Sequence, residues 1–217
     1  IRANSVFEEL DENGPILVKH PYQSFDESVT RMLREASMDP SVLAIKTTVY
    51  RTSEKSEIIP LLIDAVTAGK QVAVVVELQA RFDEAANIRW ANRLEEAGIH
   101  VVYGMKRLKT HVKLCLVVRE DDDGVRRYMH VSTGNYHPGT ARLYGDLGIL
   151  SCDPDLGENV AAVFNELTGS VSASGYGNLL VAPHMVLAPG LAILLVVLSL
   201  NLLGDRLRDR LDIRLTA

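Results

Sequence analysis

Charged residues are distributed very unevenly along this chain, and their pattern divides it into parts. None of the 38 residues from Leu167 to Gly204 is Asp, Glu, Lys or Arg, whereas seven of the ten residues from Asp205 to Arg214 are charged. The first 166 residues hold 19 basic and 25 acidic side chains, a mixture typical of a folded globular body. We therefore predict a domain over residues 1–168, a linker over 169–184 that begins with a Ser/Gly-rich run, and an apolar helix with a charged end over 185–217.

The composition limits the classes of protein to which the chain can belong. Apolar residues make up 47% of it, which supports a buried core and excludes a disordered or collagen-like chain. Its formal net charge of −5 argues against general nucleic-acid binding, so we expect no nucleic-acid partner. The sequence contains only Cys115 and Cys152 as cysteines and opens on no apolar signal segment, so we expect a reduced, cytoplasmic location.

Strand and helix patterns alternate through the predicted domain. Continuous runs of apolar and β-branched residues are typical of strands that helices cover on both faces, and Asp121–Gly124 is typical of a hairpin turn. The predicted strands are 16–18, 42–50, 72–76, 99–103, 113–119, 125–132 and 147–150, and the predicted helices are 26–38, 56–68, 83–97 and 155–167. This order predicts an α/β fold with a mixed β-sheet flanked by helices, followed by the C-terminal apolar helix.

One short stretch concentrates basic side chains with a histidine. Lys106, Arg107 and Lys109 stand just before His111 and Lys113. Because His111 and Lys113 are two residues apart, we predict that they share one face of a strand. An imidazole can act as a neutral nucleophile near pH 7, and a neighbouring ammonium can neutralise an arriving anion. The stretch therefore predicts an anion site with His111 as nucleophile, and a solvated charged face is the alternative.

A second polar motif, Thr133-Gly134-Asn135-Tyr136, follows the predicted hairpin. A Gly-Asn pair at a strand end can present N–H groups and an amide to an anion, although a plain turn uses the same residues. A His-x-Lys strand followed by Gly-Asn after the next strand resembles the half-motif of the phospholipase D superfamily. Members of that superfamily form a phosphohistidine and usually need two such motifs.

Seven longer stretches, in order, carry a more specific resemblance. They cover residues 20–25, 45–51, 75–88, 108–113, 130–136, 140–144 and 164–169. Together they resemble the long-chain polyphosphate kinase family, from about residue 5 to about residue 183. The part that they resemble is the first of that family's two C-terminal phospholipase-D-like domains.

The resemblance implies an ATP:polyphosphate phosphotransferase. It implies that the γ-phosphate of ATP moves to His111, beside Lys113, and then to the end of a polyphosphate chain. Tyr144 falls at the family's nucleotide contact, and Arg51 and Arg81 fall at its Mg²⁺–phosphate site. Because arginine has no lone pair for a metal, we expect both arginines to bind phosphate oxygens, with the cofactor Mg²⁺ held by phosphates and water. The implied partners are ATP, ADP and polyphosphate, and intact members of the family are expected to be homo-oligomers.

The resemblance covers only part of the family's length. Of the second phospholipase-D-like domain, only residues 179–183 have a counterpart here, and they resemble its first strand. A site of this class is built from two half-sites, so we expect the chain alone to be inactive.

The apolar tail predicts a different environment from that of the domain. Residues 185–204 are 20 uncharged residues, and as a helix they would measure about 30 Å, the thickness of the hydrocarbon core of a bilayer. We expect membrane contact through this segment, with a buried core helix as the alternative, and the four arginines that follow would hold that end in the cytoplasm. Residues 186–215 also resemble the C-terminus of dipeptide and oligopeptide ABC transporter permeases.

Two other functions stay open at this point. A phosphodiesterase or nuclease of the phospholipase D superfamily would share the half-motif, but the stretches around Arg51 and Arg81 argue against it. A fragment of a membrane-transport permease would have its function in the tail.

Overall fold

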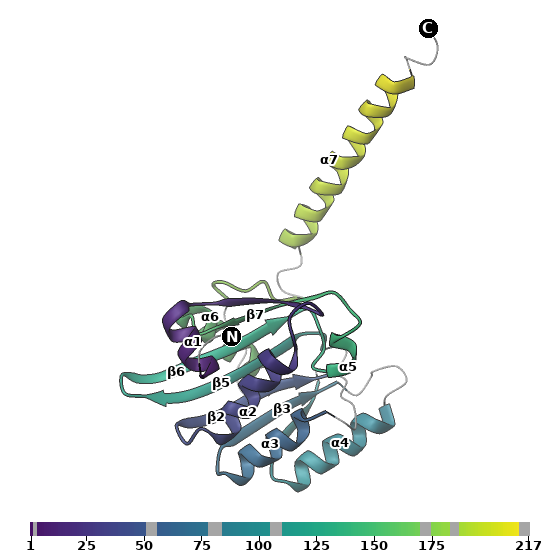
Figure 1. The fold of residues 1–217 in the computed structure, drawn as a ribbon. Coiled ribbons are helices and arrows are strands. Elements are labelled where there is room, and N and C mark those ends of the chain that lie inside the picture. The colour runs from purple at the N-terminus through teal and green to yellow at the C-terminus, as the bar shows by residue number, and fades with distance from the viewer. Residues whose placement is uncertain are drawn as a thin grey trace. The chain divides into compact units, whose positions relative to one another are not determined.

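The computed structural model describes residues 1, 4–50, 56–77, 84–104, 110–169, 175–182 and 187–212. The chain forms two compact units, Ile1–Gly177 and Asn178–Ala217. The first unit contains a β-sheet with helices on its faces, and the second contains the long helix α7 (Figure 1).

The sheet of the first unit is mixed and has seven strands in the order β1-β7-β6-β5-β2-β3-β4. Strands β2, β3 and β4 are parallel to one another, and every other neighbouring pair is antiparallel. The strands are β1 (Ile16–His20), β2 (Val42–Val49), β3 (Gln71–Val76), β4 (His100–Tyr103), β5 (Lys113–Asp121), β6 (Gly124–Ser132) and β7 (Asp146–Ser151). The predicted α/β class with a mixed sheet is therefore confirmed.

The helices of the first unit include four that the sequence predicts and two that it does not. Those predicted are the π-helix η1 (Asp26–Thr30) with α2 (Arg31–Met38), α3 (Ile58–Thr67), α4 (Glu84–Glu96) and α6 (Pro154–Leu167), and those not predicted are α1 (Val6–Asn13) and α5 (Pro138–Ala141). Ser5 caps the amino end of helix α1. Its Oγ accepts the backbone N–H of Phe7 at 3.1 Å and so satisfies one of the unpaired donors of the first turn.

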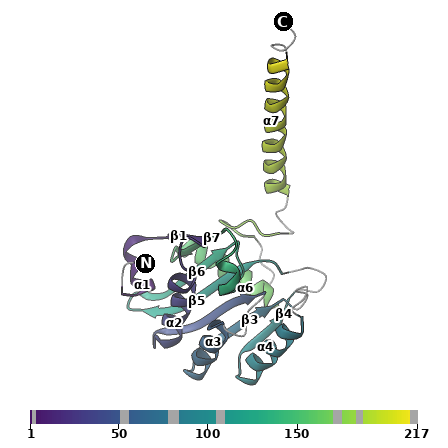
Figure 2. The ribbon, with the colours of Figure 1, turned by 45° about the vertical axis from the view of Figure 1, so that its right-hand side comes forward.

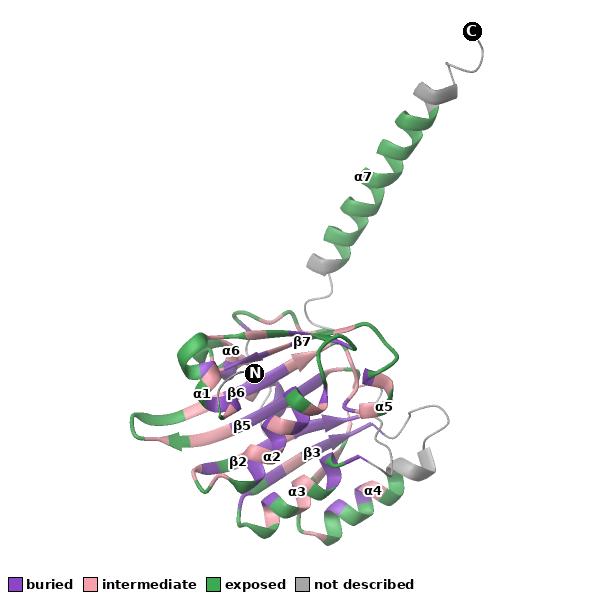
Figure 3. Ribbon diagram, in the orientation of Figure 1, coloured by how far each residue is buried: buried purple, intermediate pink, exposed green. Residues whose placement is uncertain are grey.

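The alternation of side chains along β2 assigns the helices to the two faces of the sheet. Ile45 and Val49 are buried in the main apolar core together with residues of α2 and α3, such as Leu62. Lys46 points to the opposite face, where its Nζ donates to Oδ1 of Asn165 on α6 at 3.2 Å. Helices α2, α3 and α4 accordingly cover one face and α6 the other, as Figures 1 and 2 show. Buried residues concentrate in the central strands between these layers (Figure 3).

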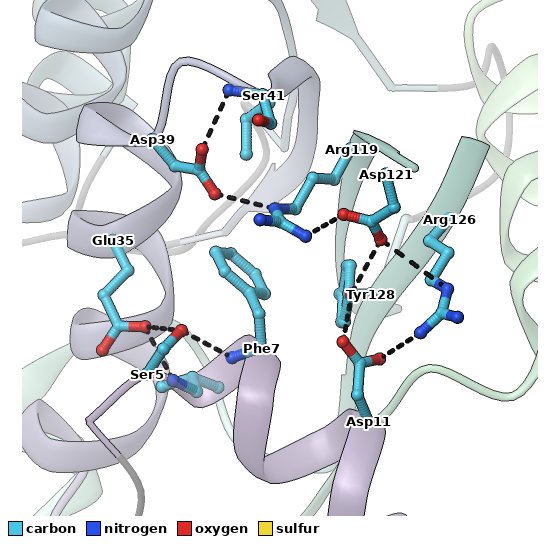
Figure 4. A network of polar contacts seen from close by, with 12 residues as sticks. Ser5, Phe7, Asp11, Glu35, Asp39, Ser41, Arg119, Asp121, Arg126 and Tyr128 are labelled. Atoms are coloured by element: carbon cyan, nitrogen blue, oxygen red, sulfur yellow. Dashed lines mark hydrogen bonds and ion pairs between the residues drawn. The ribbon is translucent and has the colours of Figure 1, made fainter. Parts of the chain in front are cut away.

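A network of charged side chains closes one end of this sheet (Figure 4). Arg119 on β5 donates from Nε to Asp39, which follows α2, at 2.8 Å. Asp11 on α1 accepts the hydroxyl of Tyr128 at 2.9 Å and pairs with Arg126 at 2.9 Å. Because Arg119 lies opposite the first residue of β2 in the ladder, the network stands at the amino end of β2. It joins α1, the turn after α2 and the β5–β6 hairpin. It lies at one end of the strands, and His111 lies at the other.

The second unit consists mainly of α7 (Leu187–Asp212). Within it, Gly190–Arg208 is long and apolar enough to cross a membrane. The apolar side chains from Leu191 to Leu207 are exposed, which does not support the alternative of a buried core helix. Residues 178–182 contain no strand, so the predicted first strand of a second domain is wrong for this stretch. A strand needs a hydrogen-bonded neighbour, and this stretch has no ladder partner among the residues that the structure describes.

Candidate active site

His111 lies where the carboxyl ends of the parallel strands β2 and β3 meet. Tyr50 directly follows β2, and the edge of its ring meets the imidazole of His111 with 6.0 Å between the ring centroids. Glu77 directly follows β3, and its Oε2 accepts the backbone N–H of Thr110 at 2.8 Å. The segment that leads into β5 therefore crosses the ends of both strands. Ligand sites in open α/β sheets gather at this edge.

Lys113 brings a buried positive charge to the same place. Its side chain is almost completely buried, and its Nζ lies 5.5 Å from the centroid of the Tyr50 ring. The same Nζ donates to the backbone carbonyl of His111 at 2.5 Å. The imidazole of His111, in contrast, is exposed. The site thus combines an accessible imidazole with a fixed ammonium, which suits the approach of an anion.

The predicted shared strand face of these two residues is wrong. Strand β5 begins at Lys113, opposite Ser132, the last residue of β6, so His111 lies outside the ladder. The backbone carbonyl of His111 accepts a hydrogen bond from Lys113, and both side chains lie against Tyr50. His111 and Lys113 therefore come together through this hydrogen bond and through Tyr50, and not through the two-residue repeat of a strand.

The loop after β6 lies beside the start of β5. Its residue Asn135 has a buried Oδ1 that accepts no hydrogen bond in the part of the chain that the structure describes. Gly134 packs against Asp146 so closely that a Cβ at this position would lie 2.6 Å from a carboxylate oxygen, and Oγ1 of Thr133 donates to the same carboxylate at 2.9 Å. A buried amide oxygen with no described donor calls for a hydrogen-bond partner, and water or a ligand can supply one.

His130 and Tyr136 anchor this loop. The two residues are fully buried, and Nδ1 of His130 lies 2.9 Å from the hydroxyl of Tyr136. Burial, and in addition the charge of His20, lowers the pKa of His130 to about 3. The imidazole of His130 is therefore neutral at physiological pH and out of reach of a phosphate in solution.

Tyr144 is an exposed residue near the end of α5. It follows the short helix α5, its backbone N–H donates to Thr140 at 3.0 Å, and 63% of its surface is exposed. Among the described residues, no contact of its ring joins it to His111 or Lys113. An exposed ring is compatible with stacking on a nucleotide base.

The remaining predicted site residues lie outside the described ranges. These are the phosphate-binding candidates Arg51 and Arg81 and the basic residues Lys106, Arg107 and Lys109.

Metal-binding groups are scarce in the described part of the chain. No group of three or more His, Cys, Asp or Glu side chains there is arranged to hold a metal ion. Mg²⁺ prefers oxygen ligands and retains several waters, and it commonly uses substrate phosphates as ligands. That Mg²⁺ is held through phosphates and water stays a prediction.

Sequence reasoning missed the aromatic ring that joins the two site residues. Tyr50 stands at the end of a predicted strand next to Arg51, and an aromatic residue at a strand end was the available signal. Its contact with His111 depends on β5 pairing with β2, which the local sequence does not specify.

The fold defines a class of protein. The chain is similar to the structure of Nuc from Salmonella typhimurium, a phospholipase D family member, with a TM-score of 0.53 and 16% sequence identity over 72% of this chain and 95% of that one. At this identity the likeness concerns the fold alone. It assigns the first unit to the phospholipase-D-like α/β domains.

The family within this class is shown by closer relatives. The family model of polyphosphate kinase C-terminal domain 1 matches residues 5–173. The polyphosphate kinase of Mycolicibacterium gilvum is 56% identical over 182 residues, which are 84% of this chain and 25% of that protein. The crystal structure of polyphosphate kinase from Porphyromonas gingivalis matches 81% of this chain and 29% of its own, with a TM-score of 0.71 and 36% identity. The chain belongs to the polyphosphate kinase family.

These matches cover only part of the relatives' length and only part of this chain. The chain spans about a quarter of the length of the curated relatives that it matches. The family match ends at residue 173, and the resemblance of residues 186–215 to a transporter permease is not borne out.

Proposed function

We propose that the first unit is the part of a polyphosphate kinase that receives the γ-phosphate of ATP on His111 and passes it to polyphosphate. The observation that supports this most directly is the exposed imidazole of His111 beside the buried ammonium of Lys113, at the carboxyl ends of β2 and β3. Because the proposed donor is ATP, we propose that the reaction takes place in the cytoplasm.

The chemistry proceeds in two transfers. In the first, an unprotonated ring nitrogen of His111 forms a bond to the γ-phosphorus, and the bond from that phosphorus to the bridging oxygen breaks, so ADP leaves with the electron pair. In the second, a terminal oxygen of polyphosphate attacks the phosphohistidine and the P–N bond breaks, which restores the imidazole. The positive charge of Lys113 offsets the negative charge of the transferring phosphate in both steps.

Other residues are proposed to hold the substrates. Arg51 and Arg81 would bind phosphate oxygens through their planar guanidinium groups, and Tyr144 would contact the nucleotide. Asn135, whose buried Oδ1 has no described donor, lies in the loop next to the start of β5. Mg²⁺ bound to the phosphates would supply further neutralisation of their charge.

The test is phosphate labelling of an intact polyphosphate kinase that carries this domain. With Mg²⁺ and ATP labelled at the γ-phosphate, we expect acid-labile, base-stable label on the peptide that contains His111, and none after His111→Ala. His100→Ala is the matched control. This exposed histidine lies at the amino end of β4, away from the carboxyl ends of the strands, so its substitution should leave labelling unchanged. Label that persists after His111→Ala would refute the proposal.

We also propose that α7 contacts a membrane. Its apolar side chains are exposed from Leu191 to Leu207, over a segment long enough to cross the hydrocarbon core. A charged residue at the centre of such a helix costs about 2.5–3.5 kcal/mol of insertion free energy. Val196→Asp should therefore abolish flotation of the chain with phosphatidylcholine vesicles, whereas Val125→Asp, at the exposed hairpin of the first unit, should not. Equal flotation of both variants would contradict membrane contact through α7.

A further inference from the structure

Glu77 is a buried carboxylate at the same edge of the sheet as His111. Only 6% of its surface is exposed. Its backbone N–H donates to the carbonyl of Val49 at 3.2 Å, which fixes Glu77 to the end of the neighbouring strand β2. A carboxylate is costly to bury unless hydrogen bonds compensate it, so its position calls for a specific partner.

One partner of this carboxylate is the residue before His111. Oε2 of Glu77 accepts the backbone N–H of Thr110 at 2.8 Å. A hydrogen bond to a charged acceptor is stronger than one between neutral groups. Thr110 and the two residues that follow it come just before the first pair of the β5 ladder, so this hydrogen bond restrains the backbone that leads into β5.

The neighbouring strand end leaves room for this contact. Gly104 follows β4 with a φ of 39°, a conformation that side chains disfavour. A Cβ at this position would lie 3.3 Å from Oγ1 of Thr110 and 3.7 Å from Oε2 of Glu77. The ends of β2, β3 and β4 therefore meet around Glu77 and Thr110: Val49 accepts the backbone N–H of Glu77, Glu77 accepts that of Thr110, and Gly104 has no side chain to fill the space beside them.

From this convergence we infer that Glu77 is a positioning residue for His111: its carboxylate holds the Thr110 amide and so sets where the imidazole stands relative to Lys113. This inference rests on the proposed role of His111 as phosphate acceptor. It requires no contact between Glu77 and the substrate, and it explains how a nucleophile outside the strand ladder keeps a fixed position beside a buried ammonium.

The test uses the full 217-residue chain in detergent micelles, with Glu77→Gln, which keeps the size of the side chain and removes its charge. Glu96→Gln is the matched control, because it makes the same change at the exposed end of α4. Two quantities are measured. One is the exchange rate of individual backbone amides by NMR. The other is the rate at which phosphoramidate phosphorylates His111, a reaction in which a ring nitrogen displaces ammonia from phosphorus.

We expect Glu77→Gln to speed exchange of the Thr110 amide about 10-fold or more, the scale of a charged hydrogen bond. We expect the amide of Val117, in the core of β5, to exchange at its original rate, and His111 phosphorylation to slow at least about fivefold, because the imidazole is no longer held beside Lys113. Glu96→Gln should change none of these rates.

Three results would overturn the inference. One is unchanged exchange at Thr110. Another is equally faster exchange at Val117, which would mean that Glu77 supports the fold as a whole. The third is faster exchange at Thr110 with unchanged phosphorylation of His111. Phosphoramidate needs no nucleotide site, so failure of Mg·ATP to label His111 in the intact enzyme would refute the proposed function and leave this result standing.

Discussion

Gly148 on β7 allows the imidazole of His130 to lie across its strand, and this predicts a large effect of one added methyl group. A Cβ at Gly148 would lie 2.5 Å from Nε2 of His130 and 3.1 Å from Cγ2 of Val18. Attractive contacts between such atoms require about 3.5–4.0 Å. The φ of Gly148 is outside the left-handed region, so Gly148→Ala adds a steric clash and no backbone strain.

The magnitude follows from how little His130 can move. Its ring is buried and hydrogen-bonded to the hydroxyl of Tyr136, so the ring cannot rotate away without losing that hydrogen bond. Overpacking of this kind costs about 1–3 kcal/mol. Replacing a glycine also restricts the unfolded chain, which returns about 0.4–1 kcal/mol. We expect Gly148→Ala to lower the free energy of unfolding by about 1–2 kcal/mol in total.

The assay is urea unfolding of the chain in detergent, read as a shift of the midpoint. Gly145→Ala is the matched control, since a Cβ at Gly145 would meet no atom within 4 Å. The clash is isolated by a double-mutant cycle with His130→Ala. In that background Gly148→Ala should cost less than about 0.5 kcal/mol. An equal cost in both backgrounds, or an equal cost for Gly145→Ala, would refute the steric explanation.

Three further predictions concern charge. Burial opposes the charged form of Asp39, but the hydrogen bonds from Arg119 and Ser41 and nearby positive charges together lower its pKa. Its contribution to stability is therefore fully present above its ordinary pKa and is lost as the pH falls from there through the lowered pKa. Asp39→Asn should cost about 1–2 kcal/mol at pH 7 and much less near pH 3, measured by urea unfolding; equal costs at both pH values would contradict this. His130 is buried in its neutral form, so stability should fall by up to about 1.4 kcal/mol per pH unit as the pH drops below about 6.5, and His130→Gln should remove that slope. Lys113→Arg keeps the charge but overfills a buried position, so we expect phosphorylation of His111 to fall at least about 10-fold; an unchanged rate would mean that only the charge matters.

The sequence predicts those parts of the fold whose signals are local. The run Val72–Val76 is apolar throughout and forms the buried strand β3, and Asp121–Gly124 closes the β5–β6 hairpin. Helix α1 is not predicted because its eight residues are too few for a clear apolar period, although Ser5 and the acidic residues of its first turn favour a helix start. Its position depends on distant partners: the carboxylate of Glu35 accepts the N–H of Val6 at 2.7 Å, and Asp11 accepts the hydroxyl of Tyr128.

In the candidate site, too, the local features follow from the sequence and the contacts between distant residues do not. The residue types of His111 and Lys113 and their place near a strand end follow from the sequence, and the structure brings the two residues together. Their shared contact with Tyr50 does not follow, because it requires the tertiary order in which β5 pairs with β2. The hydrogen bond from Thr110 to Glu77 likewise joins residues 33 positions apart.

The family stretches contain three histidines, and position relative to the strand ends separates two of them, His130 and His111. His130 lies within β6, between β5 and β7, so both neighbouring strands bury it and its imidazole stays neutral. His111 comes two residues before β5 begins, so its ring leaves the layer of the sheet and is exposed. A transferring phosphoryl group must approach the ring nitrogen in line with its leaving group, which requires open space on that side of the ring. His111, placed before the ladder begins, is exposed and offers this space, whereas the buried ring of His130 does not.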